Sequence, residues 1–187
     1  KMDRVGADYE NVVSMIRENL QANPVIVNLP IGAEDVFAGV IDLIALKEYH
    51  FDQEKGVAFE EKDIQPEHQD LVDQYREIML EAAAESDDQL LEKYLSEGVL
   101  TEAEVKQGLR KRTLAGEIVP CFAGSAFKNK GVQRLLDAIV NLLPSPLDVG
   151  SVKGVDPKDS DSEKVRGVSD DEPFSALAFK IMTDPYV

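Results

Sequence analysis

The feature that most constrains the fold is an apolar strand that leads directly into an amphipathic helix between residues 118 and 143. Residues 118–123 (IVPCFA) form a short apolar run, which predicts a buried strand. Residues 131–143 repeat apolar side chains at helical spacing, and the Pro-Ser-Pro of 144–146 ends the helix. A strand followed by a helix is typical of α/β folds, in which ligands bind at the carboxyl ends of the strands. We therefore expect an α/β fold with a candidate site at 124–127.

The beginning of the chain also places a short loop before a helix. Apolar residues recur at three- and four-residue steps over 8–21, Asp8 is a suitable N-cap, and Asn23-Pro24 ends the helix. Lys1-Met2-Asp3-Arg4 comes directly before this helix. The β-branched run PVIVNLPI (24–31) predicts a strand. The sequence starts without an initiator methionine, so we expect an internal piece of a longer protein.

The central part of the chain predicts an α+β subdomain. Two or three short strand-like pieces lie between residues 37 and 59, with a turn at 53–56, and they predict a meander. Helices are expected over 66–86, 87–95 and 101–114. The last of these begins with Thr101-Glu102-Ala103-Glu104, the sequence of a capping box. In helix 66–86, helical spacing predicts a buried stripe of Leu71, Tyr75, Ile78 and Ala82.

Negative charge is concentrated in one part of the chain. The formal net charge is −16, and residues 42–105 hold 19 acidic and 5 basic side chains, whereas 106–146 hold 2 and 7. This balance argues against a free-standing nucleic-acid binder, because affinity for nucleic acid comes from Lys and Arg that neutralise phosphates. Glu77, Glu81 and Glu85 lie one helical turn apart. They form either a plain solvated face or a surface for a basic partner.

The end of the chain is polar. Residues 147–173 are rich in Gly, Ser, Asp and Lys, and we expect a linker or a long exposed loop. The run FSALAFKIM (174–182) alternates apolar and polar positions and predicts a final strand. No stretch approaches the ~18 apolar residues of a transmembrane helix, so we expect no membrane partner. The single Cys121 excludes an internal disulfide and suits a reducing, cytoplasmic compartment.

No residue of the sequence stands out as catalytic or as a metal ligand. His50 and His68 lie in different predicted elements without the spacing of metal ligands, so we expect ordinary, partly packed histidines. Cys121 lies in the apolar strand and is expected to be a buried, inert thiol.

The two short loops before the helices carry groups that suit the recognition of guanine. A carboxylate such as Asp3 can accept hydrogen bonds from the N1–H and 2-amino groups of guanine, a donor pair that adenine lacks. The stem of Lys1 can lie along the base plane, and backbone N–H groups around Ser125 and Ala126 can donate to guanine O6. We therefore predict Lys1, Asp3, Ser125 and Ala126 as guanine-binding residues.

The same residues carry a resemblance to a known family. Lys1-Met2-Asp3-Arg4 resembles the end of the N-K-x-D motif of GTPases, and Gly124-Ser125-Ala126 resembles their later S-A motif. Four stretches are closely similar to the bacterial elongation factor G family: 27–44, 90–104, 124–146 and 174–187. The resemblance implies a partial P-loop GTPase domain that carries an inserted α+β subdomain, followed by the first strand of a β-barrel domain.

The resemblance also implies a division of the chain and a set of ligands. The GTPase domain would comprise 1–22 and 118–146, the insert 23–117, a linker 147–173 and the barrel domain 174–187. The full-length protein would bind GTP or GDP with Mg²⁺ and move tRNA and mRNA on the ribosome. Its insert would contact the ribosomal stalk protein, with Glu77, Glu81 and Glu85 as the candidate face. No direct sequence-specific contact with nucleic acid is expected.

The sequence departs from the GTPase pattern in ways that limit its own chemistry. It contains no G-x-x-x-x-G-K-[ST] phosphate loop, and the leading Asn of the first motif would precede Lys1. Without these parts phosphoryl transfer has neither positioning nor charge stabilisation, so we expect this chain alone not to hydrolyse GTP. Two alternatives stay open. One is another ribosomal GTPase, such as release factor 3 or a ribosomal protection protein, and the other is a non-enzymatic acidic interaction module.

Overall fold

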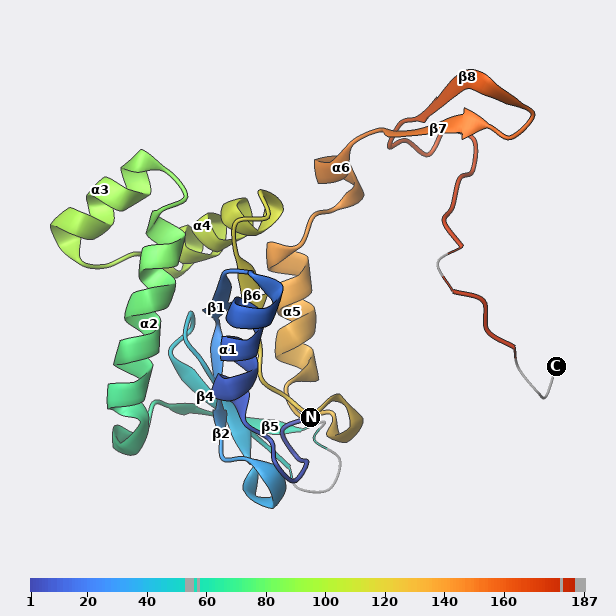
Figure 1. Ribbon diagram of the computed structural model, residues 1–187. Helices are drawn as coiled ribbons and strands as arrows, with labels where there is room; N and C mark the ends of the chain where they lie inside the picture. Colours follow the sequence, from blue (N-terminus) through green and yellow to red (C-terminus); the bar gives the residue numbers. More distant parts are fainter. Residues whose placement is uncertain (53–55, 57, 179, 184–187) are drawn as a thin grey trace. The chain divides into compact units, whose positions relative to one another are not determined.

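The computed structural model describes residues 1–52, 56, 58–178 and 180–183. The chain forms two compact units, Lys1–Leu143 and Pro144–Val187 (Figure 1). The first unit contains every residue that the sequence singles out as a candidate for binding. Among the described residues, none of the helices is both long and apolar enough to cross a membrane.

A two-stranded parallel sheet lies within the first unit. Strand β1 (Pro24–Ile26) pairs with β6 (Val119–Cys121), with Pro24 opposite Val119 and Ile26 opposite Cys121. Helix α1 (Tyr9–Leu20) precedes β1, and helix α5 (Val132–Leu142) follows β6. The Asp8 side chain accepts a hydrogen bond from the backbone N–H of Asn11 at 2.9 Å and caps α1, as predicted. The expected α/β class is confirmed here.

A four-stranded antiparallel sheet forms the strand-rich part of the central segment. Its strands are β2 (Asn28–Ile31), β3 (Gly39–Asp42), β4 (Lys47–Phe51) and β5 (Phe59–Asp63), paired in chain order. This order is the predicted meander. The single-turn 3₁₀ helix η1 (Glu34–Val36) joins β2 to β3. Of the turn expected at 53–56, only Gly56 belongs to the described residues.

The strand expected over 24–31 is divided between the two sheets. Residues 24–26 pair in parallel with β6, whereas residues 28–31 pair antiparallel with β3. Val27 lies at the junction: its N–H donates to the Cys121 carbonyl at 3.0 Å, and its carbonyl accepts from the N–H of Leu43 at 3.1 Å. Residues 24–26 therefore share a sheet with β6, whereas residues 28–31 belong to the antiparallel sheet.

Three helices follow the meander, in the positions that the sequence predicts. After the 3₁₀ turn η2 (Pro66–His68) come α2 (Gln69–Ala84), α3 (Asp88–Glu97) and α4 (Glu102–Leu114). The capping box of α4 is complete: the Thr101 hydroxyl accepts from the Glu104 N–H, and the Glu104 carboxylate accepts from the Thr101 N–H. Helix α2 crosses α4 closely: a Cβ on Gly108 would lie 2.3 Å from the Ala83 carbonyl oxygen. The glycine therefore allows the two backbones to approach.

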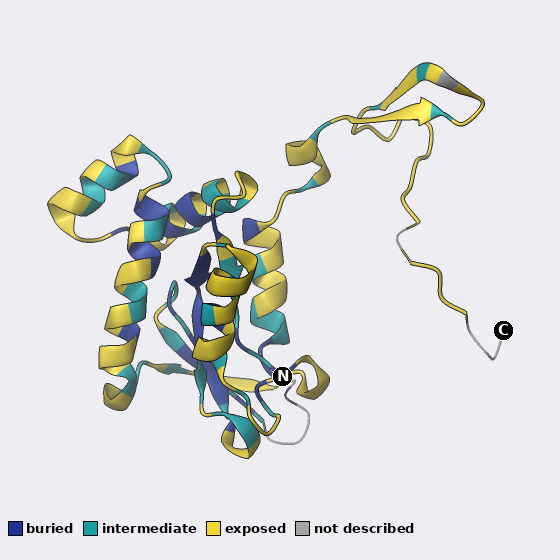
Figure 2. Ribbon diagram, viewed as in Figure 1, coloured by how far each residue is buried: buried dark blue, intermediate teal, exposed yellow. Residues whose placement is uncertain are grey.

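The buried stripe of α2 differs from the predicted one. Leu71 and Ile78 are 39% and 48% exposed, whereas Val72, Met79 and Ala83 are fully buried. The other two residues of the predicted stripe, Tyr75 and Ala82, are partly buried against the core. Figure 2 shows buried and exposed residues following one another along α2. The packed face is thus rotated by about one residue, or ~100° around the helix axis. Both stripes are apolar at helical spacing, so spacing alone does not distinguish them. Packing against β1, α3 and α4 selects the second.

The second unit corrects two further expectations. Residues 147–173 are not a plain linker, because α6 (Pro146–Val149) is followed by an antiparallel hairpin of β7 (Val152–Asp156) and β8 (Asp159–Arg166). The two residues between the strands, Pro157 and Lys158, suit a tight turn, since proline fixes the φ angle that a turn needs. The strand expected over 174–182 is absent among its described residues. An isolated apolar alternation does not form a strand without a partner to pair with.

Candidate functional site

Two loops that are far apart in the sequence meet beside the parallel sheet. We call residues 1–7 the first loop and residues 123–131 the second loop. The Ser125 hydroxyl donates a hydrogen bond to Oδ1 of Asp3 at 2.5 Å. The backbone N–H of Met2 donates to the Gly124 carbonyl at 3.1 Å. The structure therefore brings Asp3 and Ser125 together, across 122 positions of sequence.

The hydrogen bond between these loops also sets the charge of Asp3. Because the Ser125 hydroxyl donates to the carboxylate, the pKa of Asp3 lies below its ordinary value. Donation to the charged form favours ionisation, and the nearby Arg4 acts in the same direction. Asp3 is therefore an ionised acceptor at neutral pH, which is the state needed to accept two hydrogen bonds from a neutral donor pair.

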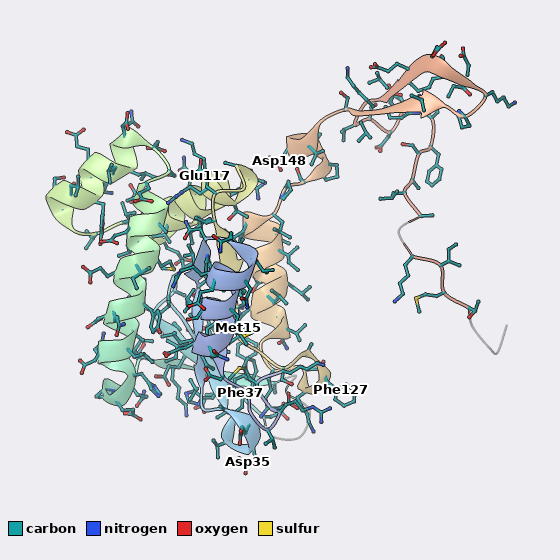
Figure 3. All side chains as sticks on the ribbon, viewed as in Figure 1. Met15, Asp35, Phe37, Glu117, Phe127 and Asp148 are labelled. Atoms are coloured by element: carbon teal, nitrogen blue, oxygen red, sulfur yellow. The ribbon has the colours of Figure 1, made fainter. Side chains whose placement is uncertain are left out.

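The second loop is held in shape by its own backbone. Ser125, only 1% exposed, forms an antiparallel bridge with Lys130, with N–H to carbonyl distances of 2.8 and 3.0 Å. The bridge encloses the 3₁₀ turn η3 (Ala126–Lys128), and Asn129 and Gly131 close it at φ 56° and 86°. Phe127 points away from the body of the unit and is 92% exposed (Figure 3).

The four predicted guanine-binding residues line a single cavity. Lys1 and Asp3 of the first loop and Ser125 and Ala126 of the second are part of the wall of a cavity of about 560 Å³. The cavity lies at the carboxyl end of β6, where ligands of α/β sheets bind. Its volume lies within the range of small-molecule sites. The arrangement offers an ionised carboxylate beside a buried hydroxyl and a loop of backbone N–H groups.

Residues 1–145 match the model of a protein family described as the elongation factor Tu GTP binding domain. The matched range covers well over half of the chain and includes both loops. The chain belongs to this family. A crystal structure of a protein from Thermus thermophilus is also similar, with a TM-score of 0.66 and 28% sequence identity over 77% of this chain and 21% of that chain. The chain therefore spans about a fifth of the length of that protein.

This family of GTP-binding domains is found in translational GTPases. The sequence contains no G-x-x-x-x-G-K-[ST] phosphate-loop motif. Among the described residues no group of three His, Cys, Asp or Glu is arranged to hold a metal ion.

The four-stranded antiparallel sheet carries a buried polar cluster that the sequence does not predict. Glu48 in β4 is fully buried, and its two oxygens contact His50 Nε2 at 2.7 Å and His68 Nδ1 at 2.6 Å. The Gln65 backbone N–H donates to the same carboxylate at 2.9 Å. Both histidines are partly buried, in line with the prediction of ordinary surface or partly packed side chains, but the sequence does not predict that they share one carboxylate. The one local signal is the spacing of Glu48 and His50, which are two residues apart in a strand and therefore lie on the same face of the sheet.

The expected acidic face lies on α2 and its C-cap residue and is exposed, but its three carboxylates differ in whether they form an ion pair within the molecule. Glu77, Glu81 and Glu85 are all exposed. Glu85 is paired with Arg112 at 2.5 Å, and Arg112 also contacts Glu117 at 2.9 Å. The charge of Glu85 is therefore partly satisfied within the molecule.

Cys121 is buried as predicted, and burial raises the pKa of its thiol. A thiol with a raised pKa is largely protonated at neutral pH and is a poor nucleophile.

Proposed function

We propose that this chain is the guanine-recognition part of an elongation factor G-type translational GTPase, together with the subdomain inserted into it. The single observation that carries the proposal is the hydrogen bond between Asp3 and Ser125, which joins two motif-like loops at one cavity. The family match supports a GTP-binding domain of the elongation factor type. The resemblance over 27–44 and 174–187 favours elongation factor G over release factor 3 or a ribosomal protection protein.

Each residue of the site has a role in this proposal. Asp3 accepts from the N1–H and 2-amino groups of guanine, and backbone N–H groups at Ser125 and Ala126 donate to O6. The stem of Lys1 covers one face of the base. The Ser125 hydroxyl orients Asp3 by donating to Oδ1. The phosphates, Mg²⁺ and the reacting water would be handled by residues that the printed sequence does not contain.

The parent protein would couple GTP hydrolysis to the movement of tRNA and mRNA on the ribosome. The chain supplies selectivity for the base rather than the chemical step, because it lacks a phosphate loop. Residues 1–26 and 118–143 would form the GTPase part, and residues 27–117 the insert, with the boundary moved to the sheet junction at Val27.

Nucleotide competition tests the proposal. A protein that joins this chain to the phosphate-binding part of a family member should bind fluorescent GDP, and unlabelled GDP should displace it at least 100-fold more effectively than ADP. Adenine offers an acceptor at N1 where guanine offers a donor, so Asp3 cannot serve both bases. Equal displacement by the two nucleotides would refute guanine recognition, and no binding of either would refute the GTPase assignment.

We further propose that the exposed acidic face of α2 contacts a basic partner, the ribosomal stalk protein. Reversing the charges of Glu77 and Glu81 to lysine should weaken stalk binding about tenfold at low salt, because exposed charges steer association. The wild-type affinity should fall as salt rises, since screening acts over about 8–10 Å. Titration calorimetry of the chain with stalk protein at two salt concentrations measures both effects.

The matched control for this prediction lies on α3. Replacing Glu92 and Glu97 by lysine changes the net charge by the same amount at two other exposed acidic positions. This variant should retain most of the affinity. Equal weakening by both pairs would mean that overall charge, and not a docking face on α2, governs the interaction. The pair Glu85–Arg112 is left intact in both variants.

A further inference from the structure

A short segment of the insert contacts both loops of the candidate site. Residues 33–37, which include η1, lie between β2 and β3. The Glu34 N–H donates to the Met2 carbonyl at 2.7 Å, and the Glu34 carboxylate accepts from the Gly6 N–H at 2.6 Å. One residue of the insert therefore holds the first loop on both sides of Asp3.

The other end of the same segment holds the second loop. The Lys130 ammonium donates to the Phe37 carbonyl at 2.7 Å and lies 5.7 Å from the centre of the Phe37 ring. Lys130 is 7% exposed and Phe37 is 1% exposed. An ammonium group is costly to bury unless it is hydrogen-bonded, so this contact fixes where the loop can lie. Lys130 is also the residue whose backbone pairs with Ser125.

An apolar cluster continues this connection beneath the two loops. It contains Phe37, Val40, Tyr49 and Phe51 from the insert together with Met2 and Ala123 from the loops. Met2 and Ala123 each lie within two residues of a predicted guanine-binding side chain. The cluster adjoins the main core, because β3 contributes Val40 to the cluster and Ile41 to the core, and Tyr9 packs against both. The loops thus rest on the insert through side chains as well as through hydrogen bonds.

The conformation of residues 33–37 is itself tightly specified. Glu34 has φ 58°, which is uncommon for a residue with a side chain. Gly32 has φ 76°, and a Cβ there would lie 2.4 Å from the Val36 carbonyl oxygen. In Figure 3, Asp35 lies at the tip of this turn and Phe37 lies further toward the body of the unit. Such an unusual local geometry persists only where the surroundings require it.

We propose that residues 33–37 are a brace that sets the position of Asp3 relative to Ser125, with Glu34 and Lys130 as positioning residues. Neither residue needs to touch the nucleotide. Glu34 fixes the first loop, Lys130 fixes the second, and the segment between them sets their separation. The insert then determines how well the site fits guanine. The ligand in this inference rests on the proposed function, whereas the brace itself rests on contacts within the chain.

The brace can be tested first in the 187-residue chain without any ligand. In Glu34→Asn the shorter side chain cannot reach the Gly6 N–H, while asparagine tolerates a positive φ. The Met2 and Ser125 amides, which are hydrogen-bonded to Gly124 and Lys130, should exchange with deuterium at least tenfold faster. Lys130→Met should have the same effect. Asp35→Asn, which removes the same charge from an exposed neighbour, should leave exchange unchanged.

Nucleotide selectivity gives a readout that a purely structural role would not change. In the chain joined to a phosphate-binding part, Glu34→Asn should lower the ratio of affinities for GDP over inosine diphosphate at least fivefold. Inosine diphosphate lacks the 2-amino group that Asp3 would accept from. Glu34→Gln keeps the acceptor oxygen and should restore the ratio. The melting temperature of both Glu34 variants should stay within about 3 °C of the wild-type value.

The two experiments separate the two proposals. Unchanged exchange of the Met2 and Ser125 amides in both Glu34→Asn and Lys130→Met overturns the brace, whatever the nucleotide data show. An unchanged ratio despite faster exchange overturns the role of the brace in base selectivity. If the wild type shows no preference for guanine, the proposed function fails, and faster exchange would still support the brace.

Discussion

Asp3→Asn should lower the affinity for GDP by about 100-fold or more and raise the affinity for xanthosine diphosphate. The carboxylate accepts from two donors of guanine, whereas the asparagine amide offers one acceptor and one donor group. Xanthine has a carbonyl oxygen where guanine has its 2-amino group, so the substituted amide can donate to it. The preference should therefore invert and not merely weaken. Competition against fluorescent GDP, in the chain joined to a phosphate-binding part, measures both affinities.

The control for this substitution is Asp8→Asn. Asp8 caps α1 close by, and asparagine is an equally good cap, so the same charge is removed without loss of structure. Both variants should unfold at the wild-type temperature, and Asp8→Asn should keep the wild-type preference. Retention of guanine over xanthine by Asp3→Asn would remove Asp3 from the base-recognition site.

The sequence predicts the local elements of this fold well, because their signals are local. The cap of α1 at Asp8, the capping box at Thr101 and Glu104 and the strands of the meander each depend on residues a few positions apart. The proximity of Asp3 and Ser125 has a different source. It follows from the chemistry of guanine and from a family resemblance, since no pattern within the chain relates residues 122 positions apart.

The errors concern tertiary choices that local patterns leave open. The run 24–31 is apolar throughout, apart from Asn28, so it does not reveal that its two halves join different sheets at Val27. Helix α2 has two apolar stripes, and only packing decides that Val72 rather than Leu71 is buried. The residues of the hairpin β7–β8 are mostly exposed, so the strands are mostly polar. Their sequence therefore lacks the alternation of apolar and polar residues by which a half-buried strand is recognised.

The contacts of Glu48 show why buried polar clusters escape prediction. His68 lies 20 residues from Glu48, in a 3₁₀ turn that precedes α2. The meander brings the end of β5 back beside β4, and this return places the Gln65 N–H and the His68 ring against the carboxylate. Neither the spacing of the two histidines nor their separate elements indicates that they share one acceptor.

Glu48→Gln should destabilise the first unit by about 2–3 kcal/mol, because a buried acceptor for three donors is lost. In the wild type, Oε1 of Glu48 accepts from the Gln65 N–H and contacts His68 Nδ1, and Oε2 contacts His50 Nε2. A glutamine has the same shape but presents one acceptor oxygen and an amino group that cannot accept. Glu60→Gln, at an exposed position of the same sheet, should change stability by less than about 0.5 kcal/mol. Urea unfolding at pH 7, followed by circular dichroism, measures both.

The stabilisation from Glu48 should also depend on pH, in a direction that its environment fixes. Burial alone would raise the pKa of Glu48, but hydrogen bonds from Gln65, His68 and His50 outweigh it, so the pKa lies below the ordinary 4.5. A carboxyl whose pKa is lower in the folded state stabilises the fold above about pH 4.5 and loses that contribution as pH falls through the folded value. The stability difference between wild type and Glu48→Gln should therefore shrink as pH decreases below about 4.5. A difference that stays constant down to pH 3 would show that packing, and not the ionised carboxylate, is what the substitution removes.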